Sequence, residues 1–253
     1  MSDPASMLCS NGHPRAQKLT ALSILARPPS GTMARMNSPG NVSRKLTEEL
    51  KLSAEELTAR VDKEKEDNPQ AMLARMNAGL LYHASDPHIQ ELSLRGKSTA
   101  QQFNRLDLAD TDSREATLES LLATYPRSAT IMAPLTVDYG HNIHIGENVF
   151  INFDAIFLDI CPITIGNDCQ IGPRAQFLAA LHPMDNHALR ASGWEYGAPI
   201  TIGDNVWLGG GVTICPGVSI GNNSVIGAGS VVTRDIPDHC FAAGTPAKVM
   251  RKL

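Results

Sequence analysis

Between residues 200 and 235 the sequence reads ITIGDN VWLGGG VTICPG VSIGNN SVIGAG SVVTRD, which is a repeat with a period of six residues. The third position of every block is aliphatic: Ile202, Leu208, Ile214, Ile220, Ile226 and Val232. A helix repeats every ~3.6 residues and a half-buried strand alternates, so neither explains this period. Fixed-period repeats with regular glycine are typical of a parallel β-helix, in which each block supplies one short strand and one corner. The sequence therefore predicts a mainly β fold, a left-handed parallel β-helix of triangular coils.

The same period extends upstream in two further runs: Ile145, Ile151 and Phe157, then Ile165, Ile171 and Phe177. The step of eight residues between these runs indicates a two-residue insertion at 159–162. The period is lost between residues 179 and 199, in a polar segment with Pro or Gly at its edges. Long loops in compact domains are usually functional or disordered. We therefore expect this segment, the 179–199 loop, to project from the solenoid and to carry chemistry.

Composition narrows the class of protein. The chain has 253 residues, 42% of them hydrophobic, and a formal net charge of −4 with both signs spread along it. The charge distribution gives no basic surface for nucleic acid. No stretch of the sequence is apolar for long enough to span a membrane. The five cysteines are an odd number without CxxC spacing, which is typical of free thiols in a reducing compartment. We expect a cytoplasmic protein without a metal site.

The chain divides into three parts. Residues 1–65 are rich in Ser, Pro, Ala and Arg, and we expect a disordered extension, with organelle targeting by residues 1–45 as the alternative. A charged helix is expected near the end of this part, and residues 66–126 are expected to be helical. Residues 127–253 are expected to form the solenoid and its tail.

Four strings resemble one enzyme family, the maltose and galactoside O-acetyltransferases, over residues 70–253. They are MLARMNAGLLYHASDP, YGHNIHIGENVFINFDAIFLDICPITIG, HPMDNHALRASGWEYGAPITIGDNVWLGGG and AAGTPAKVMRKL. The resemblance includes nodulation-type acetyltransferases, and it implies transfer of acetyl from acetyl-CoA to a sugar hydroxyl. It also implies a homotrimer whose active sites lie between neighbouring solenoids.

His182 is the candidate general base. It begins the HPMD string of the 179–199 loop, and the resemblance makes it the catalytic histidine. Histidine suits this task because its pKa lies near neutrality. A carboxylate is needed to orient the imidazole, and both Asp185 and Glu195 are near in sequence; we favour Glu195, which lies in the matching WEYGAP string. A covalent route through Ser or Cys has no motif here, so we expect direct transfer.

The resemblance implies four residues near the acceptor: Asn152, Asp159, Tyr82 and Asp86. Asn152 would bind the sugar or the oxyanion, and Asp159 would accept hydrogen bonds from sugar hydroxyls. Tyr82 and Asp86 belong to the helical segment that the family folds over the acceptor. Two departures concern acceptor identity: Ile160 replaces a second acid and Phe150 replaces an aromatic hydroxyl.

Seven residues are implied for acetyl-CoA: Trp207, Gly210, Ala228, Thr233, Arg234, Lys248 and Arg251. The tryptophan would wall the groove between adjacent solenoids, and the small residues would let the pantetheine arm pass close to the backbone. The cations would bind the phosphates.

Three alternatives stay open from the sequence. The first is a zinc site, as in the γ-type carbonic anhydrases, which are also hexapeptide solenoids. His182 and His187 have H-x4-H spacing, but they lie in a Pro-containing loop, with His141 and His144 two coils away. The second is a non-catalytic solenoid, although the loop and its histidine are present. The third keeps the enzyme and changes the acceptor to serine, a xenobiotic or an amino sugar.

Overall fold

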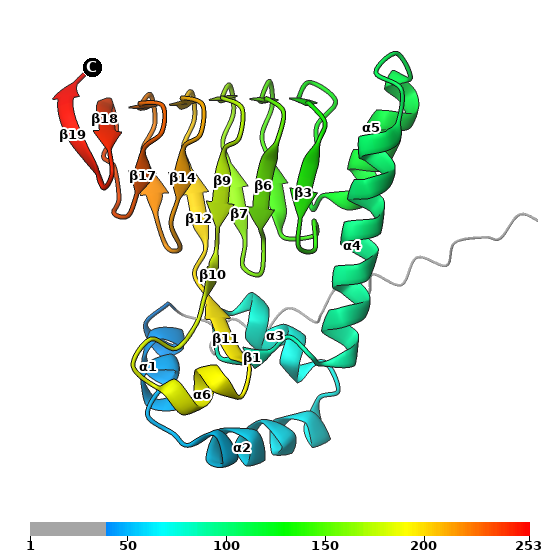
Figure 1. Cartoon of the computed structure of the whole chain (residues 1–253), viewed down its shortest axis with the longest axis vertical. Coiled ribbons are helices and arrows are strands. Elements are labelled where there is room, and N and C mark those ends of the chain that lie inside the picture. Colours follow the sequence, from blue (N-terminus) through cyan, green and yellow to red (C-terminus); the bar gives the residue numbers. More distant parts are fainter. Residues whose placement is uncertain (1–38) are drawn as a thin grey trace, which may run out of the picture.

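The repeating sequence folds into a β-solenoid of about six turns with three faces (Figure 1). The computed structural model describes residues 39–253. One face contains β4 (Ile143–Ile145), β7 (Ile163–Ile165), β12 (Ile200–Ile202) and β15 (Ser219–Ile220). Another contains β3 (Leu135–Val137), β6 (Ala155–Leu158), β9 (Gln176–Leu178), β14 (Thr213–Ile214) and β17 (Val231–Val232). The remaining face contains β2 (Thr130–Ile131), β5 (Phe150–Ile151), β8 (Gln170–Ile171), β13 (Trp207–Leu208), β16 (Val225–Ile226), β18 (Cys240–Gly244) and β19 (Ala247–Lys252).

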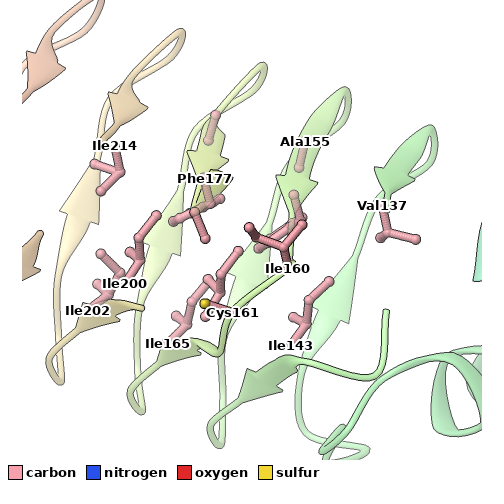
Figure 2. Close-up of a cluster of buried hydrophobic side chains, with 14 of the residues drawn as sticks. Val137, Ile143, Ala155, Ile160, Cys161, Ile165, Phe177, Ile200, Ile202 and Ile214 are labelled. Carbon is pink, nitrogen blue, oxygen red and sulfur yellow. The ribbon is translucent and has the colours of Figure 1, made fainter. Parts of the chain in front are cut away.

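The aliphatic positions of the repeat stack inside the solenoid, as predicted (Figure 2). Ile165 pairs with Ile202 on the next coil, and Ile202 pairs with Ile220 on the coil after that. Phe157 and Phe177 stack with ring centroids 4.6 Å apart and an interplanar angle of 10°. Each such buried side chain contributes about 1.5–3 kcal/mol of hydrophobic stabilisation. The period of six therefore corresponds to one inward-pointing side chain per face.

One corner of the solenoid is built from polar residues. Seven described non-glycine residues, mostly Asn and Asp, adopt a positive φ, and five of them lie at this corner: Asn148, Asp168, Asn205, Asn223 and His239. Short polar side chains tolerate this conformation best. Next to them, the backbone N–H of Asn167 donates to Asp204, that of Asp204 to Asn222 and that of Asn222 to Asp238, each at 2.7 Å. These bonds tie each coil to the next outside the sheets.

Helices cover the first coil of the solenoid. The helical segment expected within residues 66–126 contains α3 (Ala71–Asn77), α4 (Pro87–Arg105) and α5 (Thr111–Leu121). Figure 1 shows α4 and α5 standing beside β3. The side-chain amide of Asn104 donates to the carbonyl of Leu135 and accepts from its N–H, both at 2.8 Å. Gly96 lets α4 approach closely, because a Cβ there would lie 2.2 Å from the carbonyl oxygen of Tyr139. No described helix is long and apolar enough to cross a membrane.

The disorder expected for residues 1–65 does not hold for residues 39–65, whereas the charged helix expected near the end of this part is present. Residues 39–65 lie in α1 (Pro39–Glu49) and α2 (Ala54–Asp67), with Leu57 and Val61 fully buried. A charged helix needs only one apolar stripe to pack, and Leu57 and Val61 supply that stripe in α2. Ser53 and Glu56 form a capping box at the start of α2, a signal that the sequence carried. The disorder or targeting expected for residues 1–38 lies outside the described residues.

Arg75 joins these two helices to α3. Its guanidinium is 3% exposed, and it pairs with Glu49 at 2.5 Å and with Glu64 at 2.7 Å. Its Nε donates to the carbonyl of Leu81 at 2.7 Å. Burial raises the pKa of Glu64, but the hydrogen bonds and charges of Lys45 and Arg75 outweigh it and leave the pKa lowered. A buried arginine with three acceptors fixes α1 and α2 onto the rest of the chain.

Candidate active site

The 179–199 loop folds into two short strands and a helix that project from the solenoid. The strands are β10 (Ala180–Leu181) and β11 (Trp194–Gly197), and α6 (His187–Ala191) lies between them. Ile165 pairs with Ile202, 37 positions on, whereas Ile202 pairs with Ile220 only 18 positions on. The 19 additional residues leave the coil at this point, and Figure 1 shows them hanging below it beside α1 and α2.

Strand pairing places the histidine opposite a carboxylate. In the β10–β11 hairpin Leu181 pairs with Tyr196, so the next residues along each strand, His182 and Glu195, also face each other. His182 Nε2 lies 3.7 Å from Glu195 Oε2, and the two side chains are 60% and 17% exposed. Hydrogen bonds in substrate-free sites are often longer than in the reacting complex. The structure therefore brings Glu195 to His182, while Asp185 is exposed on the loop.

His182 and Glu195 border a cavity of about 630 Å³ between the loop and the helical segment. Strand β1 (Tyr82–His83) pairs with β11, with Tyr82 opposite Glu195. The Tyr82 hydroxyl is buried and has no hydrogen-bond partner among the described residues. Burial, followed by the negative charge of Glu195, raises the pKa of Tyr82. Tyr82 is thus held neutral as a hydrogen-bond donor beside the His182–Glu195 pair.

Five polar residues that line this cavity were not predicted: Gln90, Ser93, Lys97, Asp138 and Tyr139. Lys97 Nζ lies 3.4 Å from Asp138 Oδ1. Burial raises the pKa of Asp138, although the charge of Lys97 opposes it. Asp138 and Tyr139 lie in or beside the YGHN string, which carried the resemblance but was not interpreted as part of the site. Lys97 had no sequence signal, because its position in the cavity depends on how α4 packs.

Asp159 does not have the surroundings of an acceptor-binding residue. It is 0% exposed, and its carboxylate accepts from the backbone N–H groups of Asp138, Tyr139 and Gly140 at 2.7–3.0 Å. Burial raises its pKa to about 6, although the backbone donors lower it. In this structure Asp159 is engaged with the backbone and does not line the His182 cavity, and its contact with sugar hydroxyls stays a prediction. Its task is to hold the turn that carries Asp138 and Tyr139 into the cavity.

Asp86 is likewise engaged elsewhere. It caps α4 by accepting from the N–H of His88 at 3.1 Å, and it pairs with Lys65 of α2 at 2.8 Å. Burial raises its pKa, but the bond and charge of Lys65 outweigh this and lower the pKa overall. It lines a different cavity, of about 330 Å³, instead of the one that holds His182. The structure gives it a capping role and no place in the candidate site.

A groove of about 510 Å³ lies on another face of the solenoid, along β5, β8, β13 and β16. It is lined by Asn152, Trp207, Gly210 and Ala228. From the sequence we expect Asn152 near the acceptor and the other three near acetyl-CoA. Trp207 is 58% exposed, as a wall residue would be. The Asn152 side-chain oxygen accepts from the N–H of Phe153 at 2.8 Å, which leaves the amide nitrogen directed elsewhere. This groove shares no lining residue with the His182 cavity.

The predicted phosphate-binding residues lie at the far end of the solenoid. Thr233, Arg234, Lys248 and Arg251 are all exposed, and none lines the groove within one chain. Lys248 and Arg251 belong to β19, which pairs antiparallel with β18.

Metal ligation has no cluster to support it. Within residues 39–253 no group of three His, Cys, Asp or Glu side chains is arranged to hold a metal ion. His141 is instead packed edge-on against Tyr139, with ring centroids 5.6 Å apart. Burial, followed by the charge of Arg95, lowers its pKa.

Family models match two parts of the chain. The bacterial transferase hexapeptide (six repeats) model matches residues 199–234, and the maltose acetyltransferase hexapeptide capping motif matches residues 75–126. Galactoside O-acetyltransferase of Escherichia coli (strain K12) is 42% identical over 182 residues, which is 72% of this chain and 89% of the relative.

Solved structures agree with these matches. A maltose O-acetyltransferase from Clostridium difficile 630 aligns with a TM-score of 0.70 and 43% identity, covering 72% of this chain and 97% of that one. A galactoside acetyltransferase in complex with coenzyme A aligns with a TM-score of 0.69 and 42% identity, covering 72% and 90%. The solenoid and the capping helices of this chain are thus both matched, and the chain belongs to the maltose and galactoside O-acetyltransferase family of hexapeptide-repeat acyltransferases.

Proposed function

We propose that this chain transfers the acetyl group of acetyl-CoA to a hydroxyl of a sugar, with His182 as general base. The observation that carries the proposal is the His182–Glu195 pair, 3.7 Å apart at the edge of a 630 Å³ cavity. A cavity of this size lies within the range of about 300–1,000 Å³ that small-molecule sites occupy. Its polar lining of Tyr82, Lys97 and Asp138 offers donors and acceptors for several hydroxyl groups.

The proposed reaction needs no covalent enzyme intermediate. One imidazole nitrogen of His182 faces Glu195, and the other takes the proton of the sugar hydroxyl as its oxygen attacks the thioester carbonyl. Glu195 stabilises the imidazolium, which then returns the proton to the leaving sulfur of coenzyme A. Such a base accelerates transfer by roughly 10²–10⁴-fold. The Asn152 amide is proposed to donate to the oxyanion.

Acetyl-CoA is assigned to the groove beside Trp207. The groove is mostly apolar and has small residues, Gly210 and Ala228, where a thin pantetheine arm can lie against the backbone. The exposed cations Arg234, Lys248 and Arg251 are proposed to bind its phosphates.

A homotrimer would complete the site. The histidine cavity and the acetyl-CoA groove share no residue within one chain. Direct transfer requires the thioester and the base in contact, so we propose that the 179–199 loop of one chain covers the groove of its neighbour. Closed rotational symmetry would then create one complete site per interface.

The test is an acetyl-CoA assay with maltose, glucose and a galactoside, with serine and an aromatic xenobiotic as further acceptors. His182→Ala is expected to lower kcat by roughly 10²–10⁴-fold, because it removes the base. His187→Ala, in the same loop, is the matched control and is expected to retain activity. The proposal would be contradicted if His182→Ala kept full activity, or if none of the tested sugars led to release of coenzyme A.

A further inference from the structure

We infer that α1 and α2 form a brace that positions the 179–199 loop, and that Asn186 is the loop residue that this brace holds. The inference rests on the proposed role of His182. It concerns a part of the chain outside the matched capping motif, which begins at residue 75, after both helices have ended.

Asn186 lies in the middle of the loop and is satisfied at both ends of its amide. Its oxygen caps α6 by accepting from the N–H of Leu189 at 3.1 Å. Its nitrogen donates to the carbonyls of Leu50 at 3.1 Å and Leu52 at 2.9 Å, which form the turn between α1 and α2. The bond to Leu189 fixes which end of the amide is the oxygen. One side chain therefore joins the histidine loop to a segment 134–136 residues earlier.

Carbonyls at the end of a helix are suitable acceptors for these donors. The last carbonyl groups of a helix lack partners within it, and they carry the negative end of the helix dipole. Leu50 directly follows α1, which ends at Glu49. An amide donor is therefore favoured at this turn, and a carboxylate would be repelled.

The brace is anchored independently of Asn186. Glu49 at the end of α1 and Glu64 in α2 both pair with buried Arg75, at 2.5 Å and 2.7 Å. Leu57 and Val61 of α2 are 0% and 1% exposed within the hydrophobic core. The two helices can hold the loop only if they are themselves fixed to the rest of the chain, and these contacts fix them.

The position of His182 depends on this support. His182 and Glu195 are four residues before and nine residues after Asn186. Between them the regular structure consists of α6, a helix of five residues, and the first residue of β11, Trp194. A displacement of about 1 Å in a catalytic group can lower a rate by about 10²-fold. Asn186 is thus a positioning residue that touches neither substrate.

Two substitutions remove the brace contact and keep the helix cap. Asn186→Ser and Asn186→Asp both retain an oxygen suited to capping α6. The serine has a single O–H on a shorter side chain and the aspartate has no donor, so neither can reproduce the two bonds to the Leu50 and Leu52 carbonyls, and the aspartate adds charge repulsion. We expect kcat to fall by about 10–100-fold, more for Asn186→Asp, with KM for acetyl-CoA unchanged. Amide hydrogen exchange over residues 187–193 should become faster in both variants, measured in the full chain by mass spectrometry.

Arg44→Ala is the control on the brace itself. Arg44 is exposed and makes a surface pair with Glu48 at 3.2 Å, so its loss should change neither kcat nor exchange in the loop. Wild-type kcat in both Asn186 variants would overturn the inference, and so would a fall in kcat without faster exchange. If His182→Ala remains active, the proposed function fails, whereas the exchange measurement still decides whether the brace holds the loop.

Discussion

At the residue scale, Asp159 couples the shape of the cavity to pH. Its carboxyl has a pKa of about 6 in the folded chain, against an ordinary value of 3.8, and burial is the main cause. Below about pH 4 the group is protonated in both the folded and the unfolded chain. Its contribution to stability is complete there, and it is lost as the pH rises through 6, because the folded chain then holds a buried charge.

This predicts how Asp159→Asn differs from the wild type. The asparagine cannot ionise, so the wild-type free energy of unfolding should fall relative to the variant between pH 4 and pH 7. The full shift corresponds to at most about 3 kcal/mol. Urea unfolding at a series of pH values measures it. A difference that rises with pH would show that the backbone N–H donors outweigh burial.

The sequence allowed His182 to be predicted, because the repeat stops around it. It did not decide between Asp185 and Glu195, since both are close to His182 along the chain. The pairing of Leu181 with Tyr196 decides it, and that register depends on the hairpin as a whole. The surroundings of Asp159 could not be predicted for the same kind of reason: spacing along a strand does not show which backbone groups surround a carboxylate.

At the scale of elements, the joint between α1, α2 and α3 depends on one buried arginine. Arg75→Met would remove the hydrogen-bonded partner of Glu49, which is fully buried, and leave it only Lys45, whose Nζ lies 3.9 Å away. Breaking a buried pair in this way costs about 3–5 kcal/mol of stability. We expect a loss of that size in urea unfolding, and a partial recovery when Glu49→Leu is added, because the orphaned charge is then removed.

The same joint should weaken in acid. Because its partners lower the pKa of Glu64, its contribution is present above about pH 4.5 and is lost as the pH falls through the lowered value. Arg75→Met should show less of this acid sensitivity than the wild type. If instead Arg75→Met is as stable as the control Arg44→Ala, the two helices are held by apolar packing alone.

Elements with a strong period could be predicted, and elements defined by packing could not. The strands follow the aliphatic positions of the repeat because each coil buries one such residue per face. The disorder expected up to residue 65 was inferred from the Ser, Pro, Ala and Arg content of that part, yet Leu57 and Val61 of α2 join Met72 and Met76 in the hydrophobic core. A short apolar stripe is enough to hold a helix only if a buried surface elsewhere in the chain packs against it, and the sequence of the helix itself does not reveal that surface.

At the scale of the whole molecule, the proposed trimer can be tested by mixing inactive chains. His182→Ala and Asn152→Ala should each be inactive, because one removes the base and the other an oxyanion donor. In trimers assembled from both, an interface that combines His182 of one chain with Asn152 of its neighbour is intact. Random assembly of equal amounts gives about a quarter of the wild-type number of such sites.

Recovered activity after co-refolding, with the mass of a trimer by analytical ultracentrifugation, would support the shared site. If instead each site took His182 and Asn152 from the same chain, mixing the two variants would recover no activity. Refolding each variant alone is the control, and it should stay inactive.

The reversal of chain direction at β19 bears on whether the solenoid can aggregate through its open end. Every coil of the solenoid offers its successor the same row of backbone donors and acceptors, so such a stack has no inherent end and could add strands from other molecules. At β18 the chain turns back and pairs with itself antiparallel, which uses up that row. The strand left outermost carries Lys248, Arg251 and Lys252, and all three are exposed. Positive charge along this outermost edge disfavours pairing with strands of other molecules. The antiparallel β19 therefore prevents the β-helix from growing into a fibre.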